Sequence, residues 1–370
     1  MKFTCEKNAL VSAISVASRT VAQKSTIPAL EGIYIRAGVK LTLSGYNLET
    51  GITISVDAEI QQTGACIMPS RLFFDIIRKL PGDTVSISVA EKFKVSIRGG
   101  ISSFSITAMS SEDYPELPEV ESDKGISLPQ NELKAMIGGT SFAVSENQAR
   151  PIHTGCLFEV EDSSITVVAV DGYRLALRRW KSEEPIGRTL KFVVPAAALK
   201  EAEKILGDTD EACTFFLGSK HILFTIGEAT LVCRLLEGEF LDWRRVLPQN
   251  QPVKLAVNVA KMTDSIERVG LIISEKLKSP VRCKFGENTA DFRSVSTIGE
   301  AHDVCQIAGD GQDMEIGFNC RYLLDALRAI PDAECSLELI NGLSPIVMNP
   351  CDGSERYSYM VLPVRLKAGE

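Results

Sequence analysis

The sequence predicts an α+β fold made of three repeated domains, each with two helices on an antiparallel sheet. A strand followed by an amphipathic helix recurs three times, and its helix starts are 126 and 124 residues apart, at Pro69, Pro195 and Asn319. Prolines that end a preceding helix recur with a similar period, at Pro28, Pro151 and Pro280. Such a period is the length of a whole domain, and 370 residues are more than one hydrophobic core usually holds.

We place the domains at residues 1–121, 127–248 and 251–370. The two joints between them share a pattern in which an acidic residue precedes an aromatic residue and a Leu-Pro pair follows. The pattern is present from Glu112 to Pro118 and again from Glu239 to Pro248. It predicts extended linkers whose aromatic rings, Tyr114 among them, pack into a neighbouring domain.

Two helical segments are expected in each repeat, because apolar residues recur at helical spacing behind a helix-start residue. Phe73, Ile76 and Ile77 form one such stripe, which Pro81 and Gly82 end. The expected helices are 6–24, 69–80, 129–142, 195–206, 258–274 and 319–330.

Paired strands follow the first helix of every repeat, with turn residues between them. The expected pairs are Gly32–Ala37 with Lys40–Ser44, Gly155–Val160 with Ser164–Val170, and Arg282–Gly286 with Thr289–Ser296. Another pair follows the second helix, as in Val85–Val89 with Lys94–Arg98. Alternation of this kind is typical of antiparallel sheets.

The net charge of −8 taken alone argues against a nucleic-acid partner. However, the six expected helices carry thirteen basic and eight acidic residues, so they sum to +5 and the rest of the chain to −13. This positive charge would favour binding to nucleic acid only if all the helices lie on the same side of the molecule.

The ten cysteines show no CxxC pair and no metal-ligand spacing, which predicts buried thiols in a reducing compartment and no metal site. The N-terminus lacks a signal peptide, and no segment approaches the roughly 18 apolar residues of a membrane span. We expect a cytoplasmic protein with no membrane partner.

No catalytic motif is recognisable: GxxxxGK[ST], HExxH and GxSxG are all missing from the sequence. The three histidines, His153, His221 and His302, are far apart in the chain. We therefore expect that the protein is not an enzyme and binds no cofactor.

Two stretches indicate a binding surface. Asp171-Gly172 predicts a tight turn that presents Tyr173 and Arg174 together, and such aromatic and guanidinium groups are common anchors for partners. The C-terminal segment from Tyr359 to Leu366 predicts a last strand whose end lies at a sheet edge, because Pro363 cannot donate to a ladder.

Several motifs together resemble the bacterial DNA polymerase III beta subunit family, the sliding clamps. They agree in order and spacing from Met1 to Leu366: Met1-Lys2-Phe3-Thr4, Pro69 with Phe73-Phe74-Asp75-Ile76, Asp171-Gly172-Tyr173-Arg174-Leu175-Ala176, Arg244-Arg245-Val246-Leu247-Pro248, Glu315-Ile316-Gly317-Phe318-Asn319, and Leu362-Pro363-Val364-Arg365-Leu366.

The resemblance implies a DNA sliding clamp, a processivity factor without catalytic activity. The implied assembly is a head-to-tail homodimer whose six domains close into a ring around duplex DNA, with basic helices facing the phosphates. The implied partners are double-stranded DNA, the DNA polymerase III alpha subunit and other polymerases, the clamp-loader complex, and other proteins that carry clamp-binding motifs.

By the same resemblance, five residues match DNA-contact positions: Lys24, Arg71, Asn147, Pro151 and Ile152. Some relatives have aromatic residues where this chain has Pro151-Ile152, and a basic residue where it has Ala196, so DNA contact there is left open. The implied dimer seam joins Phe104 and Ile106 on an edge strand of the first domain to Leu271, Ile272 and Ile273 of the third-domain helix.

The resemblance also implies a groove between the second and third domains that binds short linear motifs, with an apolar residue pair inserted and a glutamine nearer the surface. The matching residues are His153, Val170, Gly172, Tyr173, Arg174, Leu175, Leu241, Arg245, Val246, Asn319, Tyr322, Ser344, Pro345, Met360, Val361, Leu362, Pro363, Val364 and Arg365. Val170, Tyr173, Leu241 and His153 depart from the family's usual residues, so the preferred motif stays open. No role is assigned to residues 367–370.

Two alternatives remain at this stage. A scaffold that binds peptides but never encircles DNA would suit the acidic pI of about 5.2, although it gives no reason for positive helices. An enzyme on a repeated α+β frame would need the catalytic residues that the sequence lacks.

Overall fold

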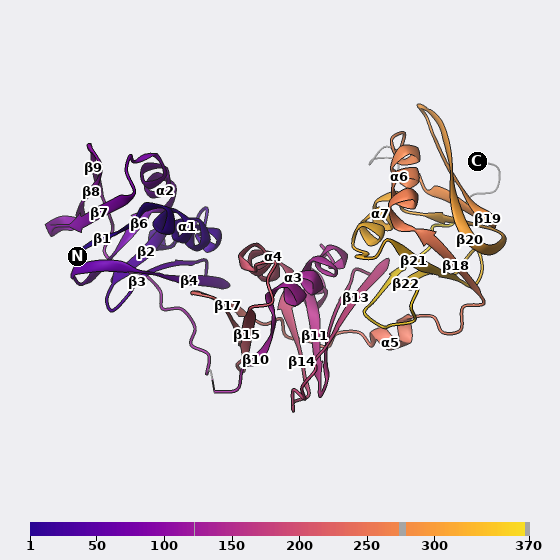
Figure 1. Cartoon of the computed structure of the whole chain (residues 1–370), viewed down its shortest axis with the longest axis horizontal. Helices are drawn as coiled ribbons and strands as arrows, with labels where there is room; N and C mark the ends of the chain where they lie inside the picture. Colours follow the sequence, from indigo (N-terminus) through magenta and orange to yellow (C-terminus); the bar gives the residue numbers. More distant parts are fainter. Residues whose placement is uncertain (122, 274–278, 367–370) are drawn as a thin grey trace. The chain divides into compact units, whose positions relative to one another are not determined.

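The computed structural model of the protein describes residues 1–121, 123–273 and 279–366, so the C-terminal extension 367–370 lies outside the described residues. The chain forms two compact units, Met1–Lys134 with Ala197–Leu235 and Ala135–Ala196 with Leu236–Glu370. The boundary between the units therefore runs through the middle repeat. Figure 1 shows the helices and strands of each unit.

The first unit contains the whole first repeat and part of the second. Its elements are β1 (Lys2–Glu6), α1 (Lys7–Ala17), β2 (Gly32–Ala37), β3 (Leu41–Tyr46), β4 (Thr50–Val56), β5 (Ala58–Gln62), β6 (Gly64–Pro69), α2 (Ser70–Lys79), β7 (Thr84–Val89), β8 (Lys94–Gly99), β9 (Ser102–Thr107), β10 (Ile126–Pro129), most of α4 (Ala196–Ile205), β15 (Ala212–Leu217), β16 (His221–Ile226) and β17 (Ala229–Arg234).

Two sheets organise this unit. One has the strand order β5-β1-β7-β8-β9, and the other the order β10-β15-β16-β17-β4-β3-β2-β6. The second sheet is continuous across repeats, because β17 pairs antiparallel with β4. Helices α1 and α2 contact each other, and their apolar faces, including Leu10, Ile14, Phe73 and Ile77, share one core with strands of both sheets.

The second unit combines the remaining middle-repeat strands with the whole third repeat. Its elements are β11 (Gly155–Glu161), β12 (Ser164–Val170), β13 (Arg174–Lys181), β14 (Leu190–Pro195), α5 (Trp243–Val246), β18 (Val253–Asn258), α6 (Val259–Gly270), β19 (Val281–Ser296), β20 (Gly299–Phe318), α7 (Cys320–Arg328), β21 (Glu334–Leu339), β22 (Ile346–Pro350) and β23 (Tyr357–Val361). Helix α3 (Gln130–Gly138) contains the boundary between the units.

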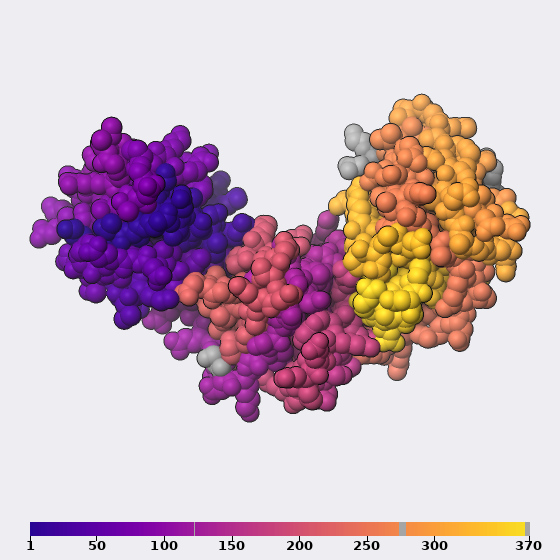
Figure 2. All heavy atoms as spheres, in the orientation of Figure 1, coloured from indigo at the N-terminus to yellow at the C-terminus, as the bar shows by residue number. Residues whose placement is uncertain are grey.

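One ten-stranded sheet runs through this unit in the order β14-β11-β12-β13-β23-β22-β21-β18-β20-β19. Its two halves come from different repeats and join where β13 pairs with β23. In Figure 2 the yellow C-terminal residues accordingly lie against magenta and rose residues of the middle repeat. Helices α6 and α7 pack together on the third repeat.

All six expected helices are confirmed, but several are shorter than predicted. α1 ends at Ala17 and is followed by a 3-10 turn, Ser18–Thr20, so Lys24 lies in a loop. α6 ends at Gly270. The expected start signals act as caps: the side chains of Asn258 and Asn319 accept hydrogen bonds from backbone N–H groups of the first helical turn.

The strand predictions are confirmed in the first two repeats, where β2 pairs with β3, β11 with β12, and β7 with β8. The third repeat differs. Its two expected strands belong to one long element, β19, and each pairs with β20. The expected turn at Gly286–Asn288 is a register irregularity in that ladder, where Asn288 has φ 55°.

Three further expectations were wrong in part. The second joint is not wholly extended, because it contains the helical turn α5. Tyr114 of the first joint stacks on Tyr34 of its own repeat, with ring centroids 5.0 Å apart, rather than on a neighbouring domain. The C-terminal strand β23 ends before Pro363, as the missing N–H requires, but it lies between β13 and β22 and not at a sheet edge.

The ten cysteines are free thiols, and most are buried. Burial raises the pKa of Cys233 and of Cys213 to about 12, so both remain protonated at neutral pH. They act as small apolar residues of the core, as the sequence predicts.

We expect Gly45→Ala to destabilise the first unit. A Cβ at Gly45 would lie 2.0 Å from the backbone oxygen of Ala17, at the point where the Thr20 hydroxyl donates to the Gly45 carbonyl. Because backbone must shift, the free energy of unfolding should fall by about 3 kcal/mol in urea denaturation.

Gly38→Ala is the matched control, since the nearest atoms to its added Cβ are 3.9 Å away. Its effect should stay within about 0.5 kcal/mol. Equal stability of the two variants would contradict the close contact.

Candidate functional site

A hydrophobic cluster covers one face of the ten-stranded sheet where the two repeats meet. This groove cluster consists of Ile152, Leu157, Val168, Val170, Leu175, Leu177, Val193, Phe240, Trp243, Val347 and Met360, with Leu236, Leu241, Leu247 and Leu362 packed against it. It includes five residues of the expected groove: Val170, Leu175, Leu241, Met360 and Leu362.

Strand register explains how residues so distant in sequence meet. Leu175 of β13 lies opposite Met360 of β23, which in turn lies opposite Val347 of β22. Side chains alternate between the faces of a strand, so these three residues form an apolar row on one face. The rest of the cluster covers this row, since each of the three side chains is 3% exposed or less.

An aromatic group stands at one end of this row. Tyr173 is 62% exposed, and its ring lies 6.1 Å from that of Tyr322, near-parallel to it. The backbone N–H of Leu362 donates to the Tyr173 carbonyl at 2.8 Å. Asn319 caps the helix that carries Tyr322, so Tyr173, Asn319, Tyr322 and Leu362 lie near one another.

Arg174 is buried under this aromatic group rather than presented to solvent beside Tyr173. It is 8% exposed and makes ion pairs with Asp171 at 2.9 Å and with Asp325 of α7 at 2.6 Å. It also donates to the carbonyl of Phe142, and its guanidinium lies 4.3 Å from the centre of the Tyr322 ring. Arg174 therefore connects the middle-repeat turn to a helix of the third repeat.

The other expected groove residues surround the cluster. Arg245 and Val246 lie exposed on α5, and Arg245 is paired with the neighbouring Asp242. Gly172 forms the turn, with φ 92°. Val361 ends β23, and the remaining residues lie in the segments beside it: Ser344, Pro345, Pro363, Val364 and Arg365. The Val364 N–H donates to Gly317, which holds the C-terminal segment against the sheet.

His153 sits at the border of the groove cluster. Its ring meets Phe240 edge-on at 5.0 Å, and its buried Nδ1 has no hydrogen-bond partner among the described residues. Burial, and then the positive charge of Arg150, lowers the pKa of His153, so the neutral form is favoured.

The expected DNA-contact residues differ in their exposure to solvent. Lys24, Arg71, Asn147 and Pro151 are exposed, and in the described part of the chain neither Lys24 nor Arg71 makes an ion pair. Ile152, by contrast, is buried in the groove cluster. We therefore leave Ile152 out of the proposed DNA surface and assign it to the groove wall.

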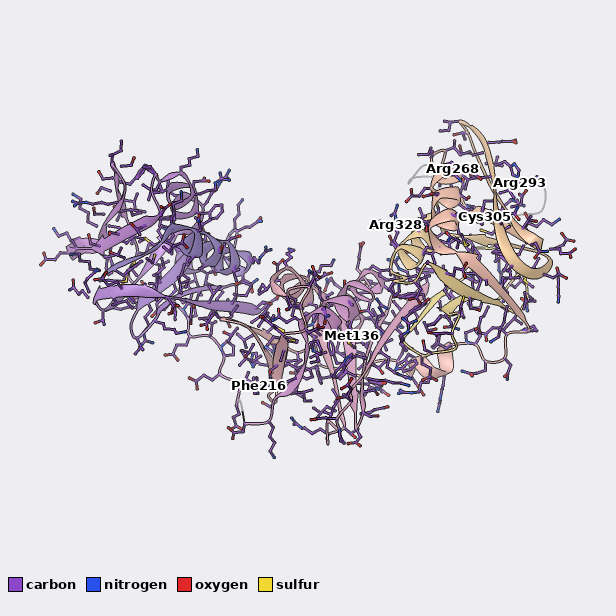
Figure 3. All side chains as sticks on the ribbon, in the orientation of Figure 1. Met136, Phe216, Arg268, Arg293, Cys305 and Arg328 are labelled. Atoms are coloured by element: carbon purple, nitrogen blue, oxygen red, sulfur yellow. The ribbon has the colours of Figure 1, made fainter. Side chains whose placement is uncertain are left out.

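Some basic residues of the helices are paired with carboxylates and others are not. Figure 3 labels Arg268 on α6 and Arg328 on α7, which are paired with Asp303 and with Glu267. Within the described ranges four exposed helix cations make no ion pair: Arg71, Lys79, Lys200 and Lys261. Lys7 of α1 makes none there either, but it is half-buried and donates to the Leu80 carbonyl. The four exposed charges remain available for phosphate groups.

Two of the five expected seam residues, Phe104 and Leu271, are exposed, and the other three are half-buried. Phe104 and Ile106 lie on β9, the edge strand of the five-stranded sheet, and Phe104 is 41% exposed. Leu271 is 82% exposed and lies with Ile272 and Ile273 just beyond the end of α6, not within the helix. Apolar residues on an open strand edge favour pairing with another chain.

Sequence reasoning missed Asp325 of the Arg174 network and most of the groove cluster, including Trp243, Leu177 and Val347. The alternation of apolar residues that continues from Leu175 to Leu177 indicates that Leu177 lies on the same face. No sequence pattern indicates the role of Asp325, because its partner Arg174 is 151 residues away.

The described residues contain no group of three His, Cys, Asp or Glu side chains that could hold a metal ion. None of the helices in those same ranges is both long and apolar enough to cross a membrane.

Comparisons with known proteins agree along the whole chain. Models of the DNA polymerase III beta subunit match in order: the N-terminal domain at residues 1–118, the central domain at 127–242 and the C-terminal domain at 244–365. The beta sliding clamps of Staphylococcus epidermidis and Staphylococcus aureus are each 32% identical to the chain, with 99% of both sequences covered.

Solved structures give the same result. A DNA polymerase sliding clamp from Bacillus subtilis is 30% identical with a TM-score of 0.94, covering 99% of this chain and 100% of that one. The DNA polymerase III subunit beta from Pseudomonas aeruginosa is 28% identical with a TM-score of 0.92, at the same coverage.

We expect Arg174→Ala to lower the free energy of unfolding of the second unit by about 3 kcal/mol, measured by urea denaturation. The substitution leaves two carboxylates, Asp171 and Asp325, without their buried partner. The matched control is Arg245→Ala, because Arg245 is exposed and its pair with Asp242 should contribute less than about 0.5 kcal/mol. A similar loss in both variants would contradict the connecting role of Arg174.

We expect His153→Leu to reduce the loss of stability in mild acid. The lowered pKa of His153 means that protons bind the unfolded chain more readily than the folded one. The stability linked to His153 is therefore present above its ordinary pKa of about 6.5 and is lost as pH falls from there through the folded pKa. Denaturation at pH 7.5 and pH 5.5 should show a smaller drop in the variant than in the native chain, and an equal drop would refute this linkage.

Proposed function

The chain belongs to the DNA polymerase III beta subunit family, and on that premise we propose which of its surfaces meet DNA, partner proteins and a second copy of the chain. As a member of this family it is a DNA sliding clamp, a processivity factor that works with DNA and a DNA polymerase and is not an enzyme. We propose that the three domains of the clamp fold span residues 1–121, 127–248 and 251–370. We also propose that the protein is cytoplasmic.

The proposed assembly is a head-to-tail homodimer that closes a ring around duplex DNA. The open edge strand β9, with the exposed Phe104, supports a seam with the residues that follow α6, Leu271 to Ile273. Such a heterologous contact joins different surfaces of two copies and closes a ring when the rotation between them permits.

The proposed DNA surface consists of unpaired cations: Lys24, Arg71, Lys79, Lys200 and Lys261, together with Asn147 and Pro151. Phosphate contacts of this kind read no base sequence, so the protein can slide. Encirclement rather than affinity would hold the clamp on the template, which agrees with a chain whose net charge is −8.

The proposed partner groove is the groove cluster with the aromatic group of Tyr173 and Tyr322. The observation that carries this proposal is the apolar row of Leu175, Met360 and Val347, where strands of two repeats pair. Its proposed occupants are short motifs of the DNA polymerase III alpha subunit, other polymerases, the clamp-loader complex and other replication and repair proteins.

We expect the clamp, once loaded on nicked circular DNA by a clamp-loader complex, to remain bound at raised salt during gel filtration and to be released when that DNA is linearised. A ring is held by topology, whereas contacts to phosphates alone weaken with salt on either substrate. Equal release from circular and linear DNA would end the encirclement proposal. Phe104→Arg is the companion variant: it should give a monomer in light scattering and lose retention on the circle.

We expect Tyr173→Ala to weaken binding of a fluorescein-labelled peptide that contains one glutamine and a Leu-Phe pair by roughly tenfold in polarisation assays. The substitution removes the exposed ring that lies over Tyr322 at the end of the groove. Tyr173→Phe keeps the ring and should bind nearly as well as the native chain. Undiminished binding by the alanine variant would remove Tyr173 from the groove.

A further inference from the structure

A cavity of about 410 Å³ adjoins the groove cluster on the same face of the ten-stranded sheet. Its apolar floor is made by Leu177, Trp243 and Val347, all of which also belong to the groove cluster. Its walls come from the chain that follows α5, residues 247–251, and from the loop 353–355. The volume is in the range of pockets that bind small ligands or side chains.

Register places this cavity directly beside the apolar row of the groove cluster. Leu175 lies opposite Met360 in the groove, and the next residue pair on the same face is Leu177 opposite Ser358, which lines the cavity. Two residues along a strand correspond to about 7 Å. A peptide whose apolar pair occupies the groove therefore reaches the cavity with its next residues.

The charged groups in the wall neutralise one another. Lys254 pairs with Glu338 at 3.2 Å, and Arg179 pairs with Glu355. Among the described residues, every charged side chain of the cavity wall is paired with a side chain of opposite charge. Entry of a charged side chain would either compete with these pairs or stay uncompensated, so the cavity favours neutral residues.

Three polar side chains of the cavity lining have no hydrogen-bond partner among the described residues: the exposed Gln249, and Asn349 on β22 and Ser358 on β23. The Asn349 amide and the Ser358 hydroxyl together offer donors and acceptors, the combination that pairs with an amide. By contrast, the nearby Gln251 amide is already bonded to the Pro248 carbonyl.

We infer that this cavity is a second subsite of the clamp, which binds neutral, amide-containing residues that flank the apolar pair of a partner's motif. The inference rests on the proposed function of the groove and extends it. Partners that share an apolar pair would then differ in affinity through their flanking residues, which Asn349 and Ser358 contact.

The test compares three labelled peptides by fluorescence polarisation on the full chain. One contains only the glutamine and the Leu-Phe pair, and the others add alanine, glutamine and serine at the N-terminal or the C-terminal end. We expect one of the extended peptides to bind roughly tenfold more tightly than the short one. Asn349→Leu and Ser358→Ala should remove that gain and leave affinity for the short peptide unchanged, which also shows that the variants are folded.

Gln306→Leu is the matched control, because this exposed amide on β20 does not line the cavity, and it should preserve the gain. If the short peptide binds and neither extension tightens it, the second subsite is wrong while the groove stands. If an extension tightens binding equally in the native chain and in both cavity variants, the contact lies elsewhere and the inference is also overturned. If the short peptide fails to bind the native chain, the groove proposal itself fails.

Discussion

The backbone pairing of β13 with β23 is the interaction on which the rest of the second unit depends. It runs from Arg174 opposite Val361 to Arg178 opposite Tyr357 and joins two repeats into one sheet. Because side chains alternate, the same ladder determines both faces. If β13 slipped by one residue, Leu175 and Leu177 would turn to the opposite face, and Ala176 and Arg178 would take their places beside Met360.

Arg174 contributes to that register from the opposite face. Burying its guanidinium carries a desolvation cost, which two carboxylates and the Phe142 carbonyl offset. Asp171 is in the same turn, whereas Asp325 is on α7, so the network is complete only when the two repeats are correctly paired. We interpret the buried ions as a determinant of register, in addition to any net stabilisation they provide.

Much of the fold could be predicted from the sequence because repeats reinforce one another. Caps such as Asn319 and stripes such as Phe73, Ile76 and Ile77 are local signals, and each recurs at the domain period. The extent of β19 could not be predicted, because Gly286 to Asn288 forms a turn or a bulge according to its partner strand, and that partner is β20.

The candidate site, too, could be predicted only in part from the sequence. Residues of the Asp171 to Leu175 segment were identified correctly as neighbours, but their burial was not, since Arg174 points inward only because Asp325 lies opposite. Ile152 likewise depends on tertiary packing, because a residue in a short turn faces solvent or core according to what lies beneath it, here the groove cluster. Resemblance to a family transfers the positions of residues more reliably than their exposure.

The distribution of charge and apolar surface separates two tasks that a sliding protein must perform. The proposed DNA surface has five cations, and contacts to phosphate weaken as salt rises, so these residues alone would give a weak and mobile association. Strong attachment must therefore come from elsewhere. The exposed Phe104 on an open strand edge and the exposed Leu271 beyond α6 offer burial of apolar area, which salt does not screen. In the proposed ring, the energy that keeps the protein on DNA resides in the contact between subunits, and the contact with DNA stays weak enough to permit sliding.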